Sequence, residues 1–358
     1  MESLELNKTF WQGRSVFLTG HTGFKGGWLA LWLTEMGAKV NGYSLDVETS
    51  PNFFNIIKLK DIIQNSTISD IRDLPRLLNS MQKAKPSIIF HMAAQPLVRQ
   101  SYNDPIETFT TNVTGTVNVL EAARKIETVE AIINITTDKC YQNREWDRPY
   151  HETDRLGGYD PYSSSKACSE IVTSAYRNSF FKKTQVKLAS VRAGNVIGGG
   201  DWATDRLIPD FFRSIDNNEM LFIRSPQAVR PWQHVLDPLA GYLILAEKLV
   251  ENKSNFAEAW NFGPEQSGAK TVSWVLEKLS EKFVNARWEK ENTKQQHEAS
   301  ILKLDISKAK SKLGWTPRWP LETAIDNTIE WYQAFKENKK MQEFSIKQIK
   351  LYESFESK

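Results

Sequence analysis

The sequence has few cysteines and no long apolar run. Only Cys140 and Cys168 are present among 358 residues, so neither a disulfide framework nor a cysteine-based metal site is predicted. No apolar stretch approaches the roughly 20 residues that span a bilayer. The start of the chain, Met1 to Arg14, also lacks the basic-then-apolar pattern of a signal peptide. We therefore expect a cytoplasmic protein with reduced thiols and no membrane partner.

An excess of charge of one sign is also missing. The 46 Lys and Arg residues nearly balance the 43 Asp and Glu residues, and the net charge of +3 is spread along the chain. This balance suits a small anionic ligand and gives no support for binding to nucleic acid. His21 and His234 stand in no metal-ligand spacing, so no metal is predicted.

Short apolar segments alternate with helix-period segments over the first 198 residues. Strands followed in turn by helices are typical of a doubly wound parallel sheet, so an α/β Rossmann-type fold is predicted. The predicted strands are 15–19, 39–43, 66–68, 87–91, 131–136, 187–191 and 260–262, and the main predicted helices are 112–125, 161–180 and 234–250.

A glycine-rich turn separates the first strand from the first long helix. Its glycines, Gly20, Gly23 and Gly26, are spaced three apart. Glycine lets the backbone turn tightly there and approach a pyrophosphate at the helix N-terminus. We therefore predict a dinucleotide cofactor that contacts Gly20, Thr22, Gly23, Phe24, Lys25 and Gly26.

Two later segments fit the adenosine half of such a cofactor. Asp70 and Ile71 follow the third strand, where a carboxylate can accept a hydrogen bond from the adenine amino group. Ala93 and Ala94 follow the fourth strand, and their small side chains let a cofactor lie against the backbone. All four residues are predicted to bind the cofactor.

The second strand ends without the acidic residue that usually holds the ribose hydroxyls. Ser44 occupies that place and Asp46 lies two residues later, and the choice between them stays open. No Arg or Lys follows until Lys58, so no basic residue is placed to bind the 2′-phosphate of NADP. NAD is therefore predicted rather than NADP.

Beyond about Gly198 the alternation weakens, and shorter elements rich in Trp and Pro follow. This change predicts a second, smaller domain of mixed α/β type. We expect an NAD-binding Rossmann domain over 1–198 with 232–264 returning to it, a substrate domain over 199–231 and 265–345, and a charged tail at 346–358.

Tyr162 and Lys166 stand four residues apart, on one face of a predicted helix. A phenol with a reference pKa of about 10 is a poor base at neutral pH. A nearby ammonium and the positive nicotinamide would favour the phenolate, so Tyr162 is predicted to take a hydroxyl proton as hydride leaves, and both residues to contact the cofactor. Tyr332 and Lys336 share the spacing, but no strand precedes them.

Thr137, Asp138 and Lys139 follow the fifth strand at its carboxyl end, where ligands of open α/β sheets bind. Thr137 can hydrogen-bond the reacting hydroxyl. A simple dehydrogenase or epimerase needs only this hydroxyl together with Tyr162 and Lys166. The two added ionisable neighbours therefore indicate a second proton transfer.

A family resemblance covers nearly the whole chain and is carried by residues 20–28, 90–99, 137–141, 157–166, 192–202, 230–235 and 260–264. These segments resemble the CDP-glucose 4,6-dehydratases, a sugar-nucleotide dehydratase branch of the extended short-chain dehydrogenase/reductase superfamily. Most sugar-nucleotide 4,6-dehydratases carry Asp-Glu after the Thr, whereas this chain carries Asp138-Lys139, as the CDP-glucose branch does.

The resemblance implies a redox-neutral conversion of CDP-glucose to CDP-4-dehydro-6-deoxyglucose and water. Tyr162 would deprotonate the C4 hydroxyl while NAD takes the C4 hydride, and Asp138 would protonate the departing C6 hydroxyl before hydride returns to C6. Lys139 would serve the elimination, either as a neutral base at C5 or as a charged stabiliser of the C4 enolate. The sequence leaves both roles open.

Four residues are expected at the substrate: Gln95, Asn195, Arg206 and Arg230. Arginine makes planar, bidentate contacts to phosphate, so the last two suit a pyrophosphate. Nothing in the residues themselves proves cytidine over another nucleobase. The resemblance also implies a homodimer or homotetramer that serves deoxysugar biosynthesis, such as that of lipopolysaccharide O-antigen.

Two rival functions stay open. A nucleotide-sugar 4-epimerase, or a dehydratase of another nucleotide hexose, would share Thr137, Tyr162 and Lys166, but an epimerase has no use for Asp138 and Lys139. A non-catalytic, NAD-responsive binding protein on the same scaffold is the rival from another class. The complete set of polar residues argues against it.

Overall fold

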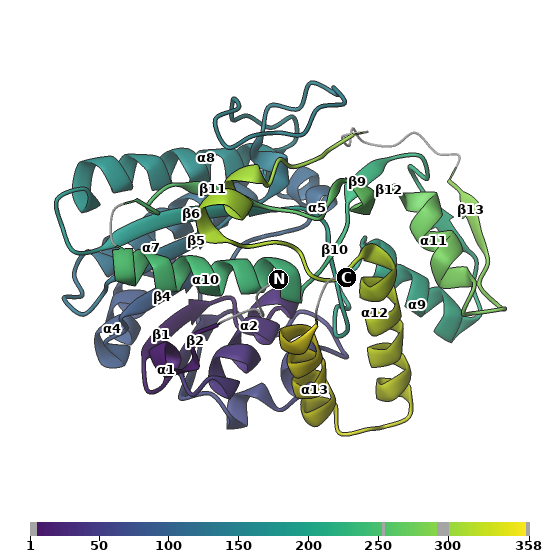
Figure 1. The fold of residues 1–358 in the computed structure, drawn as a ribbon, viewed down its shortest axis with the longest axis horizontal. Coiled ribbons are helices and arrows are strands. Elements are labelled where there is room, and N and C mark those ends of the chain that lie inside the picture. Colours follow the sequence, from purple (N-terminus) through teal and green to yellow (C-terminus); the bar gives the residue numbers. More distant parts are fainter. Residues whose placement is uncertain (1–5, 253–254, 292–300, 356–358) are drawn as a thin grey trace.

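Seven parallel strands form the central sheet of the computed structural model, which describes residues 6–252, 255–291 and 301–355 (Figure 1). The order is β11-β6-β5-β4-β1-β2-β3, so the chain winds outward in both directions from the junction of β1 and β4. This confirms the predicted doubly wound sheet. The strands are β1 (Ser15–Thr19), β2 (Lys39–Ser44), β3 (Asn65–Ile68), β4 (Ile88–His91), β5 (Ala131–Ile135), β6 (Lys187–Ala193) and β11 (Ala259–Phe262).

Alternate side chains of each strand enter two cores on opposite faces of the sheet. In β1, Val16 and Leu18 belong to the core under α2 (Phe24–Glu35) and α10 (Leu236–Asn252), whereas Phe17 belongs to the other. Because both of their faces are buried, the central strands β4 and β5 are largely apolar, whereas the edge strand β3 is polar and more exposed. The helices of the second face are α4 (Leu74–Ala84), α7 (Gly115–Ala123) and α8 (Pro161–Tyr176).

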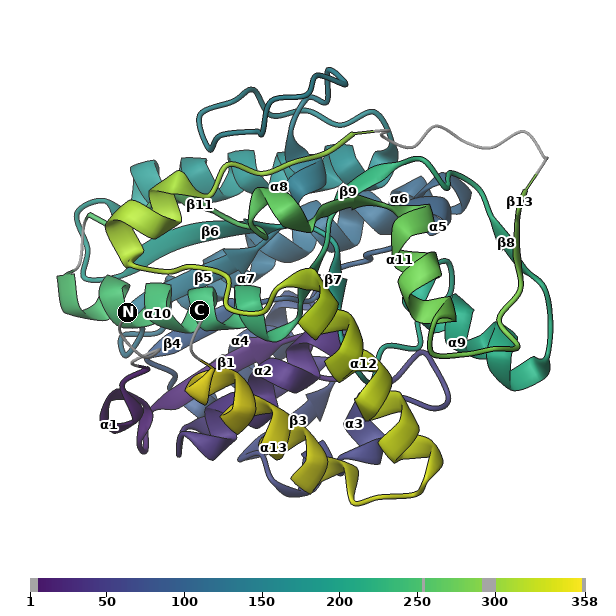
Figure 2. The same ribbon diagram turned by 45° about the vertical axis from the view of Figure 1, so that its right-hand side comes forward.

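A second region stands beside the carboxyl ends of the strands (Figure 2). It has its own buried core, to which Phe211, Leu276 and Ile325 belong. We propose the predicted division into two domains on this basis. The elements of the region are β8 (Leu221–Ile223), β9 (Val229–Pro231), β12 (Ala269–Thr271), β13 (Trp288–Lys290), α9 (Leu207–Asn217), α11 (Val272–Ser280) and α12 (Leu321–Lys336), and β7 (Val196–Ile197) pairs with β10 (Gln233–His234) at its base.

Three of the predicted segments differ from the structure. Within the predicted helix 161–180, α8 ends at Tyr176 and residues 177–181 form a π-helical turn. The segment 112–125 is not one regular helix, because residues 110–114 form a π-helical turn before α7 begins. In that turn the Asn112 amide donates to the Gln95 carbonyl (3.0 Å) and to the Ser165 hydroxyl (2.8 Å).

The remaining α-helices are α1 (Lys8–Trp11), α3 (Phe53–Ile56), α5 (Val98–Asn103) and α6 (Pro105–Phe109).

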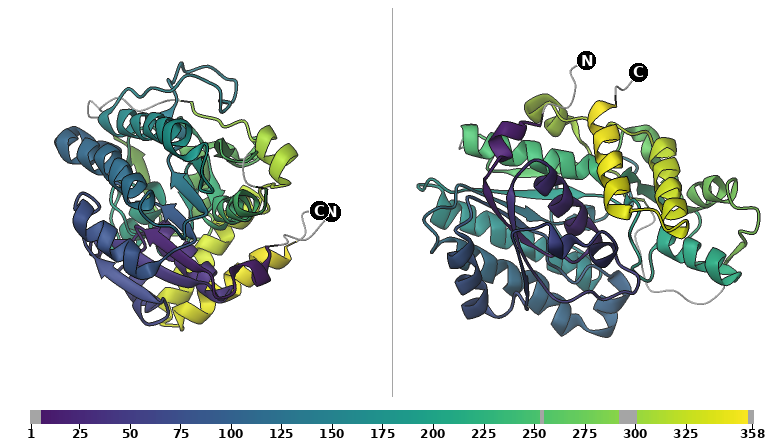
Figure 3. Two further views of the ribbon diagram at one scale, coloured as in Figure 1. Left: turned by 90° about the vertical axis from the view of Figure 1, so that its left-hand side faces the viewer. Right: turned by 90° about the horizontal axis from the view of Figure 1, so that it is seen from below.

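The expected charged tail at 346–358 is wrong for the part that the structure describes. Residues 346–354 belong to α13 (Met341–Ser354), which packs against α12 and α2 (Figure 3). Ile349 and Tyr352 lie one turn apart on its buried face, and the Tyr352 hydroxyl donates to Asp237 at 2.8 Å. The charged residues Lys347, Lys350 and Glu353 around them obscure this apolar stripe in the sequence. Residues 356–358 lie outside the described part.

Among the described residues, no helix combines the length and the apolar character needed to cross a membrane.

Candidate active site

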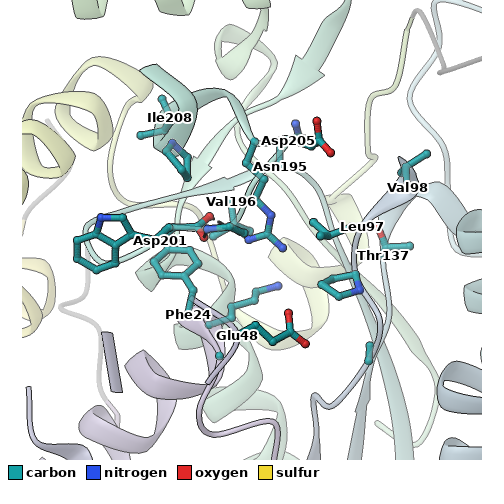
Figure 4. Close-up of a pocket in the computed structure, with 18 of the residues that line it drawn as sticks. Phe24, Glu48, Leu97, Val98, Thr137, Asn195, Val196, Asp201, Asp205 and Ile208 are labelled. Atoms are coloured by element: carbon teal, nitrogen blue, oxygen red, sulfur yellow. Dashed lines mark hydrogen bonds and ion pairs between the residues drawn. The ribbon is translucent and has the colours of Figure 1, made fainter. Parts of the chain in front are cut away.

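A cavity of about 580 Å³ opens at the carboxyl ends of the strands, between the sheet and the second region. It contains the junction of β1 and β4, where the strand order reverses and ligands of such sheets bind. Figure 4 shows Thr137 and Leu97 on one side of the cavity and Asp201 and Ile208 on the other.

The glycine turn forms the floor of the cavity, and its shape depends on the absence of side chains. Gly20 has a φ of +80°, and a Cβ there would lie 2.8 Å from the Ala93 nitrogen. A Cβ on Gly26 would lie 2.0 Å from the Gly20 carbonyl oxygen. Among the described residues, no side chain caps the α2 N-terminus at Gly23. The first backbone N–H groups of α2 are therefore available to an anion such as a pyrophosphate.

Residues at the ends of β2 and β3 line the adenosine end. The Thr22 hydroxyl lies 2.8 Å from that of Ser44, which is buried, whereas Asp46 is exposed. The Asp70 carboxylate accepts from Arg72 Nε at 2.9 Å, and this guanidinium holds the pKa of Asp70 below its usual value. Both Ser44 and Asp46 line the cavity, so the choice of ribose ligand stays open.

Tyr162 and Lys166 enter the cavity from the first turns of α8. The helix starts there because Asp160 caps it, accepting from the Ser163 N–H at 2.8 Å, and Pro161 follows. Tyr162 is buried, and the Lys166 ammonium donates to the Ile135 carbonyl at 3.3 Å. Both residues of the predicted pair thus line the cavity at the carboxyl ends of the strands.

The protein alone does not favour the phenolate that the sequence analysis expected. The pKa of Tyr162 is raised to about 12, mainly by burial and also by the charge of Asp138, although a hydrogen bond with Thr137 and the charge of Arg206 act in the opposite direction. Burial also lowers the pKa of Lys166 to about 8, against the charge of Glu170. A further positive charge is therefore needed beside Tyr162 for it to act as a base.

Asp138 and Lys139 form a short turn beyond β5, and the turn begins at Thr137. Asp138 is 1% exposed, and its Oδ1 accepts from the Thr137 hydroxyl at 2.9 Å. Its Oδ2 is buried without a hydrogen-bond partner among the described residues. The Lys139 ammonium lies 3.7 Å from Asp138 Oδ1, and 26% of its side chain is exposed. The turn thus offers the cavity one buried carboxylate and one accessible ammonium.

A buried network that the sequence analysis missed lies beneath this turn. The Glu170 carboxylate accepts from Thr136 (2.5 Å), from Ser190 (2.7 Å) and from Arg192 (2.8 Å). Arg192 also donates to the Tyr141 hydroxyl at 2.8 Å. Burial alone would raise the pKa of Glu170, but Arg192 and these hydrogen bonds hold it below its usual value. The signal was the repeated spacing of four from Tyr162 to Lys166 to Glu170.

Lys25 lies next to the glycine turn, and its side chain is held by a residue far away in the chain. Its ammonium donates to the buried Tyr242 hydroxyl at 3.0 Å. Burial, together with the charges of Lys166 and Arg206, lowers the pKa of Lys25 to about 7. Several cationic groups therefore share this part of the cavity, and it attracts anions.

Of the four predicted substrate residues, three line the cavity and one does not. Asn195, Arg206 and Arg230 line the cavity, and the Arg206 guanidinium is held by Asp201 at 2.9 Å. Gln95 does not line the cavity, contrary to the prediction. Its amide donates to Thr108 at 2.8 Å and accepts from its own loop, at the Leu97 N–H, at 2.6 Å. Gln95 therefore stabilises its own loop, and its contact with the substrate stays a prediction.

The second Tyr and Lys pair of the chain lies away from the cavity. The Tyr332 hydroxyl donates to Asp216, and the Lys336 ammonium lies 2.7 Å from the same carboxylate. Neither residue lines the cavity. Structural context separates this pair from Tyr162 and Lys166, as predicted.

Comparison with known proteins gives consistent relatives. A family model described as GDP-mannose 4,6 dehydratase matches residues 17–328. The CDP-glucose 4,6-dehydratase of Salmonella typhimurium is 52% identical over 98% of this chain and 99% of that protein. The dTDP-glucose 4,6-dehydratase of Haemophilus influenzae is 24% identical over 89% of this chain and 97% of that protein.

Solved structures share the fold at lower identity. The dTDP-glucose 4,6-dehydratase of Bacillus anthracis in complex with NAD has a TM-score of 0.74 at 21% identity, covering 92% of this chain and 100% of that one. The UDP-glucose 4-epimerase of Thermotoga maritima with UDP-glucose has a TM-score of 0.74 at 23% identity, covering 90% of this chain and 99% of that one. With the family model spanning most of its length, the chain belongs to the GDP-mannose 4,6 dehydratase family.

Proposed function

We propose that the protein is an NAD-dependent CDP-glucose 4,6-dehydratase, which converts CDP-glucose to CDP-4-dehydro-6-deoxyglucose and water. The observation that carries the proposal is Asp138, which is buried next to Thr137 with one oxygen lacking a partner among the described residues. A second proton transfer needs such a group, and oxidation at C4 alone does not. The relative with 52% identity supports the choice of CDP-glucose.

NAD fits the cavity. Gly20 and Gly26 leave no room for a Cβ, and α2 begins there without a side-chain cap among the described residues. Ala93, Ala94 and Asp70 line the same end. When bound, NAD supplies a hydride acceptor for C4, a hydride donor for C6 and a positive charge beside Tyr162.

Tyr162 takes the proton of the C4 hydroxyl. Thr137 hydrogen-bonds Tyr162 and so orients the phenol, and the Lys166 ammonium is held against the end of β5 by the Ile135 carbonyl. Burial keeps the phenol protonated in the free protein, because it raises its pKa to about 12. Proton removal is thereby confined to the loaded site.

Asp138 and Lys139 serve the loss of water. Asp138 delivers a proton to the departing C6 hydroxyl through its Oδ2, which has no hydrogen-bond partner among the described residues. The Lys139 ammonium lies on the same turn at 3.7 Å from Asp138 and stabilises the negative charge that develops on the C4 oxygen while a water molecule takes the C5 proton. As a neutral amine, Lys139 would take that C5 proton itself.

Arg206 and Arg230 bind the pyrophosphate of the substrate with Asn195. Arg206 is oriented by Asp201 at 2.9 Å, and Arg230 is buried in β9. A guanidinium fixed in this way can make two parallel hydrogen bonds to phosphate oxygens. The sugar is thereby directed at Tyr162, whose electrostatic neighbours include Arg206.

The test is incubation with the CDP-, GDP-, dTDP- and UDP-forms of glucose and mannose, with detection of product by mass spectrometry. The proposal expects a product one water lighter from CDP-glucose. An isomer of unchanged mass would indicate an epimerase instead. Dehydration of another nucleotide hexose, with CDP-glucose inert, would leave the class of reaction but refute the substrate.

We also propose a homodimer formed through α6 and α8. Ile106 (76% exposed), Phe109 (37%) and Ile171 (57%) present apolar side chains on these two adjacent helices. Exposed apolar groups gathered on neighbouring helices are typical of a subunit interface. Sedimentation should find a dimer or tetramer, and Ile171→Glu should shift it towards monomer. A monomeric wild type would refute the proposal.

A further inference from the structure

The turn that carries Asp138 and Lys139 ends at Tyr141, a buried residue that does not line the cavity. The Tyr141 hydroxyl accepts a hydrogen bond from the Arg192 guanidinium of β6 at 2.8 Å. It donates to the side-chain oxygen of Asn261 in β11 at 2.6 Å. A buried phenol thus ties the end of the turn to the two strands that lie beyond β5 in the sheet.

The ring of Tyr141 is fixed by packing as well as by its hydroxyl. It stacks on the ring of Tyr150, with centroids 5.2 Å apart and planes 19° apart. The Arg192 guanidinium carbon lies 4.9 Å from the centroid of the Tyr141 ring. Removal of the hydroxyl would therefore leave the ring packed and would release only the tie between the end of the turn and the strands.

The two groups that serve the first step are held by other contacts. Tyr162 lies in the first turn of α8, which Asp160 caps. The Lys166 ammonium donates to the Ile135 carbonyl, at the end of β5, at 3.3 Å. None of these contacts passes through Tyr141. The Tyr141 hydroxyl therefore holds the turn without holding the pair that oxidises C4.

Thr137 begins the same turn, but it is fixed from the side of the sheet. It follows Thr136, whose N–H donates to the Val191 carbonyl at 2.8 Å and whose hydroxyl donates to Glu170 at 2.5 Å. The start of the turn is thus held by β5 and its neighbours. A loosened end of the turn would displace the residues between its two fixed points, which are Asp138 and Lys139.

We propose that Tyr141 is a positioning residue for the loss of water, because its hydroxyl holds the turn so that Asp138 and Lys139 meet the oxidised sugar. Oxidation at C4 does not depend on it. This inference rests on the proposed function, since it concerns the second half of the same reaction. Reacting groups must be placed closely, and a displacement of about 1 Å can cost about 10²-fold in rate.

The test compares wild type, Tyr141→Phe and the matched control Tyr150→Phe. Both tyrosines are buried, and their rings stack on each other. The Tyr150 hydroxyl also makes two hydrogen bonds, accepting from the Arg144 N–H at 2.7 Å and donating to the Asn143 side chain at 2.9 Å. Those partners lie in the loop beyond the turn, away from the strands. The control thus removes the same group from the neighbouring ring without releasing the turn.

The measurement is a single turnover of CDP-glucose followed by mass spectrometry. It separates the oxidised nucleotide hexose, two hydrogens lighter than the substrate, from the dehydrated product, one water lighter. Tyr141→Phe should form the oxidised species at a rate near that of wild type and convert it to product about 10- to 10²-fold more slowly. Entry of solvent deuterium at C5 should slow in parallel. Tyr150→Phe should change neither the ratio of the two rates nor the deuterium entry.

The outcomes separate the inference from the proposed function. Wild type inert towards CDP-glucose would refute the proposed function and the inference together. Wild type active, with the ratio of the two rates in Tyr141→Phe unchanged, would refute the inference alone. An equal fall of both rates would do the same, because it would make Tyr141 a general support of the fold, and so would an equal change of the ratio in Tyr150→Phe.

Urea unfolding shows whether each variant is folded. Arg192→Lys provides the same comparison if Tyr141→Phe does not fold. It keeps a positive charge beside Glu170 but loses the planar guanidinium that bonds Glu170 and Tyr141 together. The ratio of the two rates should change in the same direction, and an unchanged ratio would refute the inference.

Discussion

The cofactor end of the cavity is formed by the ends of long buried strands, whereas the nucleotide end is formed by ribbons of two or three residues per strand. Tyr162 and Lys166 lie at the first end, and Arg230 of β9 lies at the second. Rigid elements hold catalytic groups in a narrow range of geometry, and shorter elements tolerate change in what they bind. Substitutions should therefore have large effects on chemistry at one end and smaller, substrate-dependent effects at the other.

Tyr162→Phe should give the largest effect on turnover, because it removes the base for the first step and leaves the packing nearly unchanged. General-base catalysis typically contributes about 10²- to 10⁴-fold to the rate. Tyr159→Phe is the matched control, since Tyr159 is 76% exposed and lies three residues away. The measurement is kcat for CDP-glucose. Near-normal activity of Tyr162→Phe would show that another group is the base.

Glu170→Gln should lower the free energy of unfolding far more than the removal of an exposed carboxylate does. It leaves the Arg192 guanidinium, which is 4% exposed, without its counter-charge. Removing one partner of a buried ion pair typically costs about 3–5 kcal/mol. Glu281→Gln is the control, because the carboxylate of its pair with Lys278 is 58% exposed and such pairs contribute little. Urea unfolding measures both, and equal effects would contradict the distinction.

Glu170→Gln should also change the pH dependence of turnover. Burial lowers the pKa of Lys166 to about 8, and the charge of Glu170 raises it. Without that charge the pKa of Lys166 should fall further, so its ammonium is lost at a lower pH. The alkaline decline of kcat should therefore begin at lower pH than in wild type. An unchanged or upward-shifted alkaline limb would show that Glu170 does not act on Lys166.

The two ends also differ in how far sequence alone predicts them. The turn at Gly20 and the pair of Tyr162 and Lys166 depend on contacts within one short segment, so their spacing predicts their place. The pairing of residues 229–231 with 269–271, and of 221–223 with 288–290, joins segments far apart in the chain. Local patterns carry no signal of such pairing. These two ribbons therefore emerged only from the structure.

Gln95 and Glu170 illustrate the same limit within single motifs. Gln95 directly follows Ala94, and Glu170 lies four residues after Lys166; the sequence analysis assigned the substrate to Gln95 and nothing to Glu170. In the structure the Gln95 amide is used within its own loop, and the Glu170 carboxylate accepts hydrogen bonds from three side chains under the turn at Thr137. Adjacency in sequence does not tell which way a side chain points.

Lys139→Ala should stop the reaction after oxidation at C4, with a loss of water formation of about 10²-fold. Lys139 stands at the boundary between the two regions, on the turn after β5 but partly exposed. A nucleotide hexose two hydrogens lighter than CDP-glucose should accumulate in single-turnover reactions, and solvent deuterium should enter C5 slowly. Normal dehydration without that species would refute the role. Lys187→Ala, at the opposite end of the sheet, is the control.

Asp201→Asn should have the smallest effect, at the nucleotide end. It removes the counter-charge of Arg206, whose side chain is 35% exposed, and such partly exposed ion pairs typically contribute at most about 1 kcal/mol. We expect KM for CDP-glucose to rise a few-fold while kcat stays near the wild-type value. A large fall in kcat with unchanged KM would place Arg206 in the chemistry instead of in binding.

The central claim is that one site removes hydrogen at C4 and returns it at C6 while water is lost. CDP-glucose labelled with deuterium at C4 tests it directly, by mass spectrometry and NMR of the product. The account predicts a product one water lighter than the labelled substrate, with the deuterium at C6. Deuterium retained at C4, or lost to the solvent, would contradict it.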